Sequence, residues 1–167
     1  MNKTDLRTKA KNIRKNLPLD KISQKAIELI QENELYKKSK HVMIYYPTKY
    51  EINLLELLKD DKKFYLPRVN GKNLDVCPYN CNDRLIKSDF NILEPTTEPV
   101  ENKILDLVIV PALMADFNNY RLGYGGGYYD RFINSDFKTL VVIPKDLYIE
   151  ELPVEKTDKK IDLVLIA

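Results

Sequence analysis

Some residue types that build common catalytic or metal sites are nearly missing from this chain. Its 167 residues include two cysteines, Cys77 and Cys81, and a single histidine, His41. A structural zinc site needs about four nitrogen or sulfur ligands, and the C-x3-C spacing has no second pair, so that kind of site is excluded. The cysteines are expected to be ordinary thiols, with a Cys–His nucleophilic pair as the alternative.

Long apolar runs are also missing. The longest, Leu107 to Ala115, contains Pro111 and is much shorter than the ~18 residues that cross a bilayer. The N-terminus is charged and has no apolar signal core. We therefore expect a cytoplasmic protein with no membrane partner.

The charge is small overall but unevenly placed. The net charge of +2 does not argue for nucleic acid, yet residues 1–40 carry eleven Lys/Arg and five Asp/Glu, which leaves the remainder net acidic. The spacing of apolar residues from about 4 to 17 predicts a helix that ends before Pro18. Its apolar stripe and its basic stripe lie side by side. A basic stripe there can face a bound anion; a merely solvated face is the alternative. The apolar residues are Leu6, Ala10, Ile13 and Leu17, and the basic ones are Lys3, Arg7, Lys11 and Arg14.

Apolar strands alternate with helical segments along the rest of the chain. We expect strands at 41–47, 62–67, 106–111, 139–144 and 161–166, with a weaker one at 73–79. Helices are expected at about 20–34 and, as a short helix capped by Asn53, in the stretch that follows this residue. Residues 80–103 read as a loop and as a candidate lid. This pattern predicts a single α/β domain over 1–167, with an open, mostly parallel sheet and helices on both faces.

The few glycines are concentrated in one place. Four of the five lie between positions 123 and 127, in the stretch RLGYGGGYYD (121–130). Glycines let consecutive backbone N–H groups converge on an anion without interference from Cβ atoms. The stretch matches neither a P-loop, which needs a lysine after its last glycine, nor the G-x-G-x-x-G dinucleotide fingerprint. A tight structural turn packed by tyrosines is the alternative.

Charged residues flank these glycines. Arg121 precedes them and can pair with phosphate oxygens. A short helix should begin within the cluster and run to about Ile133, adding its N-terminal dipole. Asp130 lies in its first turn, where a carboxylate can hold Mg²⁺ beside phosphates. The window therefore predicts a site for a nucleoside triphosphate and a metal ion, near the carboxyl end of the strand at 106–111.

The chain resembles the 5-formyltetrahydrofolate cyclo-ligase family over nearly its whole length. The most specific match is RLGYGGGYYDR (121–131). Supporting matches, in agreeing order and spacing, are KTDLR (3–7), Tyr46 to Glu51, YLPRVNGKNL (65–74), NILEP (91–95) and ELPVEKTDKKID (151–162).

The resemblance implies an open α/β sheet and a monomeric enzyme whose partners are a folate and ATP. It implies ATP- and Mg²⁺-dependent closure of 5-formyltetrahydrofolate to 5,10-methenyltetrahydrofolate, with release of ADP and phosphate. In the family's reaction the formyl oxygen attacks the γ-phosphate, the folate's N10 attacks the phosphorylated formyl group, and phosphate departs. Such phosphoryl transfer needs positioning and charge neutralisation more than covalent help from the protein.

The resemblance also implies roles for particular residues. Asp130 and Asp158 would hold Mg²⁺, and Arg121 and Asp130 would act in catalysis. ATP would contact Lys3, Thr4, Asp5, Leu6, Arg7, Arg121, Leu122, Gly123, Tyr124, Gly125, Gly126, Gly127, Tyr128 and Tyr129. The folate would contact Tyr46, Glu51, Tyr124, Gly125, Gly126, Gly127 and Tyr128. Without the resemblance, Glu51 reads equally well as an acid in the first turn of a helix.

Two positions depart from the family's pattern. Thr157 stands where a histidine usually precedes the aspartate, and Tyr120 stands where a glycine is common. We expect these changes to alter loop mobility more than chemistry.

Two other functions are compatible with parts of the sequence. An α/β enzyme on another phosphorylated small molecule, such as a sugar-phosphate isomerase, would use the glycine loop without ATP. A module for single-stranded nucleic acid would use the basic helix, but the tyrosines are not interleaved with Lys/Arg as such binding requires.

Overall fold

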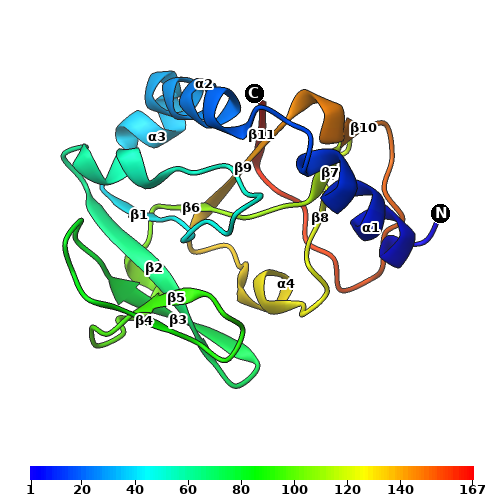
Figure 1. Ribbon diagram of the computed structural model, residues 1–167. Coiled ribbons are helices and arrows are strands. Elements are labelled where there is room, and N and C mark those ends of the chain that lie inside the picture. Colours follow the sequence, from blue (N-terminus) through cyan, green and yellow to red (C-terminus); the bar gives the residue numbers. More distant parts are fainter.

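Six strands form the main sheet of the computed structural model, which describes residues 1–167 (Figure 1). Their order is β11-β9-β6-β1-β2-β3, and every neighbouring pair is parallel except β2 and β3. The bounds are β1 His41–Met43, β2 Lys63–Asn70, β3 Asn73–Pro78, β6 Leu107–Ile109, β9 Lys138–Ile143 and β11 Leu163–Ile166. The predicted mostly parallel sheet is confirmed.

The central strands of the sheet are buried on both faces because they are mainly apolar runs whose side chains alternate between two cores. Val108 and Val141 point into one core, and Leu107 and Leu140 into the other. The first core is covered by helices α1, Lys3–Arg14, and α4, Tyr128–Phe132. The second is covered by helices α2, Leu19–Glu32, and α3, Glu34–Lys38. Helices on both faces are therefore confirmed.

Helix α1 begins where the sequence predicts a start. The Asn2 side chain accepts a hydrogen bond from the Asp5 backbone N–H at 2.8 Å, and the Asp5 carboxylate accepts one in return from the Asn2 N–H. This reciprocal cap satisfies two N–H groups that the first turn leaves without partners. The α1 helix then lies beside β7, Met114–Asp116, β8, Arg121–Leu122, and the segment that leads to β11 (Figure 1). That position places its basic residues next to segments far away in sequence.

Several short elements differ from the sequence expectation. The segment after Asn53 forms a 3₁₀ helix, η1, Leu55–Lys59. Residues 80–103, expected to be irregular, contain the hairpin of β4, Leu85–Lys87, and β5, Leu93–Pro95, followed by the 3₁₀ turn η2, Asn102–Ile104. A second small sheet is formed by β10, Tyr148–Ile149, β7, Met114–Asp116, and β8, Arg121–Leu122, and the 3₁₀ turn η3 spans Lys145–Leu147. Strands of two or three residues leave too few positions for an alternating pattern. None of the helices combines the length and the apolar character needed to cross a membrane.

Candidate active site

A cavity of about 940 Å³ lies at the carboxyl ends of the central strands. Tyr45 and Tyr46 follow β1, Pro111 follows β6, and all three line the cavity. Strand β2, which follows β1 in the chain, pairs with one edge of β1, and β6 pairs with the other edge. This is the point at which α/β sheets bind ligands, and the volume is typical of small-molecule sites.

Most of the predicted site residues line this one cavity. They are Lys3, Thr4, Arg7, Tyr46, Glu51, Arg121, Leu122, Gly123, Tyr124, Gly125, Gly126, Gly127, Tyr128, Tyr129, Asp130 and Asp158. Thr157, at the position that departs from the family pattern, also lines it. Two predicted ATP-binding residues lie elsewhere. Leu6 packs in the core, and Asp5 caps its own helix.

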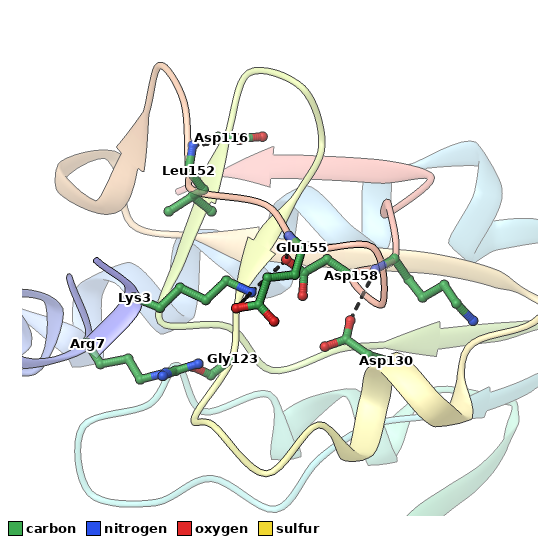
Figure 2. Close-up of polar contacts among 9 residues, drawn as sticks. Lys3, Arg7, Asp116, Gly123, Asp130, Leu152, Glu155 and Asp158 are labelled. Atoms are coloured by element: carbon green, nitrogen blue, oxygen red, sulfur yellow. Dashed lines mark hydrogen bonds and ion pairs between the residues drawn. The ribbon is translucent and has the colours of Figure 1, made fainter. Parts of the chain in front are cut away.

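Helix α1 reaches across the cavity with two of its basic residues. Lys3 Nζ donates to Asp158 Oδ2 at 2.6 Å and lies 3.5 Å from Glu155 Oε1 (Figure 2). Arg7 Nε donates to the Gly123 carbonyl at 2.9 Å. Lys11, on the same stripe, is exposed. The helix therefore contacts both the glycine loop and residues 155–158. The Lys3–Asp158 contact joins residues that are 155 positions apart.

The glycine loop needs glycine at two positions for its backbone shape. Gly125 has φ +110° and lies against Arg7, and Gly127 has φ +70° where α4 begins. Side chains rarely adopt these conformations. A Cβ on Gly127 would also lie 2.6 Å from Arg131 Nη1. The predicted start of the helix inside the cluster is confirmed, but α4 has only five residues, so its dipole is small.

Arg121 is a cation with incomplete hydrogen bonding beside the cavity. Its Nη1 donates to the Pro111 carbonyl at 3.1 Å and its guanidinium stacks over the Tyr129 ring at 5.5 Å, but its buried Nε has no partner. Burial lowers the pKa of Arg121, while the charge of nearby Asp130 opposes that shift. A cation held this way gains more from an anionic ligand than a fully paired one would.

The two predicted metal ligands present one free oxygen each. Asp158 Oδ2 accepts from Lys3 and from the Glu155 N–H at 2.8 Å, and Asp130 Oδ1 accepts from the Lys159 N–H at 3.2 Å (Figure 2). Burial by itself would raise the pKa of Asp158, but the hydrogen bonds from Lys3 and Glu155 hold the pKa below its usual value.

The acidic residues suit a metal that arrives with a phosphate. The chain has no group of three or more acidic, histidine or cysteine side chains arranged to hold an ion. Mg²⁺ is commonly held by one or two carboxylates that act together with substrate phosphates and water. The pair Asp130 and Asp158 fits that mode of binding and does not fit a metal site made of protein groups alone.

Glu51 lies in a turn after the first strand. Its Oε1 accepts from the Thr48 N–H at 2.9 Å, while η1 begins only at Leu55, so the alternative of a first-turn helix acid is wrong. Burial, and then the charge of Glu51, raise the pKa of Tyr124 well above its usual value. Glu51 and Tyr124 both line the cavity, so they can contact the same ligand.

Some residues that shape the site were not found from the sequence. Asp116 is fully buried and accepts hydrogen bonds from the N–H groups of Asn118, Tyr120 and Leu152, which ties the β7–β8 hairpin to the segment that leads to Asp158. Asn119 adopts φ 65°, so an asparagine takes the left-handed conformation beside Tyr120. In the sequence, the role of Asp116 was indicated only by its place at the end of an apolar run and just before a Phe-Asn-Asn turn.

The β4–β5 hairpin also contributes to the cavity. Phe90, Ile92, Leu93 and Glu94 line it, and the Phe90 ring meets the Tyr128 ring edge-on at a centroid distance of 6.3 Å. Glu94 is buried, and its Oε2 accepts from the Val69 N–H at 2.8 Å. The candidate lid segment therefore borders the cavity, and its closure stays a prediction.

Cations, a glycine loop and carboxylates around a cavity at this position are typical of α/β enzymes that act on phosphorylated small molecules. The model of the 5-formyltetrahydrofolate cyclo-ligase family matches residues 1–167, so the chain belongs to that family. Its activity is that of a 5-formyltetrahydrofolate cyclo-ligase, also termed methenyltetrahydrofolate synthetase, and the isomerase alternative is set aside.

Relatives and solved structures agree with this family. The 5-formyltetrahydrofolate cyclo-ligase of Haemophilus influenzae is 26% identical, with 96% of this chain and 95% of that one covered. The NMR structure of Aquifex aeolicus 5,10-methenyltetrahydrofolate synthetase is 32% identical, has a TM-score of 0.87, and covers 99% of this chain and 90% of its own. The Mycoplasma pneumoniae synthetase shares the fold, with a TM-score of 0.75 at 22% identity, covering 99% and 98% of the two chains.

Proposed function

We propose that the cavity binds ATP with Mg²⁺ beside 5-formyltetrahydrofolate and couples ATP cleavage to ring closure through a phosphorylated formyl group. The observation that carries the proposal is the meeting of three groups in one cavity. These are the cations of α1, the glycine loop with Arg121, and the carboxylates Asp130 and Asp158.

The ATP phosphates would lie between α1 and the glycine loop. Lys3 and Arg7 approach from the helix, Arg121 from β8, and the backbone N–H groups of residues 123–127 from the loop. Charge-assisted hydrogen bonds of this kind are about twice as strong as neutral ones. They would neutralise charge on the transferring phosphoryl group, which is the main requirement of this reaction.

Asp130 and Asp158 would hold the Mg²⁺, each through the oxygen that has no hydrogen bond in the structure. When bound, the ion would supply charge neutralisation at the phosphate oxygens. Lys3 pairs with Asp158 and would be free to contact the phosphates once that carboxylate turned to the ion. The protein's part is therefore to position two carboxylates and to exchange one ion pair.

The folate would lie against Tyr46, Glu51 and the tyrosines of the glycine loop. The Glu51 carboxylate would accept hydrogen bonds from N–H groups of the pterin, and Tyr124 and Tyr128 would border its flat ring system. The formyl oxygen takes the γ-phosphoryl group and ADP leaves. N10 then bonds to the formyl carbon, the C–O bond breaks, and phosphate departs with that oxygen while N10 loses its proton.

We propose that the protein acts as a monomer, as the resemblance to the family implies. Its partners would be the folate and ATP, with no nucleic acid.

The direct test follows the methenyl chromophore after the protein is mixed with Mg–ATP and 5-formyltetrahydrofolate. Product should form together with ADP, and ADP release should depend on the folate. If neither the chromophore nor folate-dependent ADP release appears, the proposal is wrong.

The metal assignment is tested by Asp130→Asn against Asp136→Asn. Asp130 lines the cavity, whereas Asp136 is an exposed acid just beyond α4. We expect the first change to lower kcat by about 100-fold or more, since a metal ligand supports several kcal/mol of charge stabilisation. Asp136→Asn should leave kcat within about 2-fold, as usual for surface changes. Equal effects of the two changes would show that Asp130 is not a ligand.

A further inference from the structure

Arg14 is the one basic residue of the α1 stripe that is removed from water. It is 3% exposed, whereas Lys11, one turn earlier, is exposed. No carboxylate pairs with it, and its buried Nε has no hydrogen-bond partner. Burial of a charge without an opposite charge costs several kcal/mol even after the structure relaxes.

The hydrogen bonds that the Arg14 side chain makes all go to backbone carbonyls of two other segments. Nη1 donates to Tyr50 O at 3.0 Å, and Nη2 donates to Ala112 O at 2.6 Å and Leu113 O at 3.3 Å. The first acceptor belongs to the turn that contains Glu51. The other two belong to the segment that connects β6 with β7.

These acceptors connect Arg14 to the two halves of the proposed site. Tyr50 is the neighbour of Glu51, which would bind the folate. The carbonyl that precedes Ala112, that of Pro111, accepts from Arg121 at 3.1 Å, so two arginines hold three consecutive carbonyls. Arg14 also sits on the helix that presents Lys3 and Arg7. One guanidinium thus contacts backbone groups next to the residues proposed to bind ATP and next to the one proposed to bind the folate.

Anchoring alone does not require a charge at this position. Leu6 and Ala10 already bury the apolar face of α1 in the core, and Ile13 packs against it. A planar guanidinium differs from such side chains because its donors form a rigid fork that fixes several acceptors at once. An arginine used in this way sets the relative positions of the segments that it joins.

We propose that Arg14 is a positioning residue that couples the two halves of the cavity, so that nucleotide binding orders the folate turn and folate binding orders α1. The inference rests on the proposed function, because it takes ATP and the folate as the two ligands. It adds a mutual dependence of their affinities that passes through one buried side chain. Reciprocity then requires that each ligand tighten the other by the same factor.

The test measures that factor by calorimetry, with Mg²⁺ and a non-hydrolysable ATP analogue, and with 5-formyltetrahydrofolate. Each ligand is titrated alone and in the presence of the other, for the wild type, Arg14→Lys and Lys11→Met. We expect mutual tightening of about 5-fold or more in the wild type and in Lys11→Met, equal in both orders of addition. In Arg14→Lys, which keeps the charge but loses the fork, the factor should fall below about 2-fold. Single-ligand affinities of this variant should change less than the coupling does.

A second measurement does not depend on the folding of any variant. In the wild type, the ATP analogue alone should slow hydrogen exchange at the amides of residues 48–52, although this turn would contact the folate, through Glu51, and not ATP. Unchanged exchange there, absence of coupling in the wild type, or full coupling in Arg14→Lys would each overturn the inference. Binding of both ligands with no coupling would leave the proposed function standing, whereas failure of the wild type to bind either would overturn both.

Discussion

Helices α1 and α2 both belong to the basic N-terminal part of the chain, yet only α1 has basic side chains that contact other segments. On α1, Lys3 and Arg7 contact groups across the cavity. On α2, Lys21 and Lys25 are exposed and make no hydrogen bond or ion pair. Both helices bury an apolar face against the sheet, on opposite sides of it. The difference lies in what faces the cations. Only α1 lies opposite carbonyls and carboxylates supplied by the glycine loop and residues 155–158.

Among the changes that test this comparison of α1 with α2, the largest effect should come from removing the cation of α1 that contacts the glycine loop. Arg7→Ala should raise the KM for ATP about 10- to 100-fold, because a hydrogen bond to a charged group contributes about 1.5–3 kcal/mol. Initial rates at varied ATP and saturating folate measure this. Lys11→Ala, on the exposed part of the same stripe, is the matched control. An unchanged KM in Arg7→Ala would make α1 no different from α2.

A smaller effect concerns stability and pH. In EDTA, Asp158→Asn should lower the free energy of unfolding at pH 7 by roughly 1.5–3 kcal/mol, since it removes a charged hydrogen-bond acceptor from the partly buried Lys3. The pKa of Asp158 is lowered in the folded state, so its stabilisation is present at neutral pH. It is lost as the pH falls below about 4 and through the folded-state pKa. Urea unfolding from pH 7 to pH 3 should show the wild type and the variant converging. A difference that stays constant over this range would contradict the ion pair's role.

The smallest effect is expected on α2. The double change of Lys21 and Lys25 to alanine should leave the KM for ATP within about 2-fold and the free energy of unfolding within about 0.5 kcal/mol, as for other exposed positions without partners. The same rate assay and urea unfolding measure both quantities. A clear rise in KM would mean that net positive charge, and not its placement opposite the cavity, is what attracts ATP.

The central part of the fold could be predicted from the sequence because its signals are strong and local. The runs around β6 and β9 are continuously apolar, and Pro18 separates two amphipathic helices. The small sheet and the β4–β5 hairpin could not be predicted in the same way. Their strands are two or three residues long, and β10 pairs with β7 from a distant part of the chain. Such pairing is set by tertiary contacts and leaves almost no periodicity.

The site shows the same division between local and distant information. Arg121 and Asp130 could be assigned because they flank a glycine cluster whose composition is itself a signal. Nothing in the sequence separates Arg14 from Lys11, since both lie on one basic stripe. Only the approach of Tyr50 and Leu113 decides that the first is buried.

The contact between Lys3 and Asp158 has a consequence for the folding of the protein during its synthesis. Because the partners are 155 positions apart, the two walls of the cavity come together only after residue 158 has been made. Closing so long a stretch of chain is entropically unfavourable until the intervening core exists to compensate it. A growing chain on the ribosome would therefore contain the glycine loop and Lys3 before Asp158 is available to pair with that lysine. The catalytic centre would form only once residue 158 is available, and a chain that ended before this residue would remain inert toward ATP.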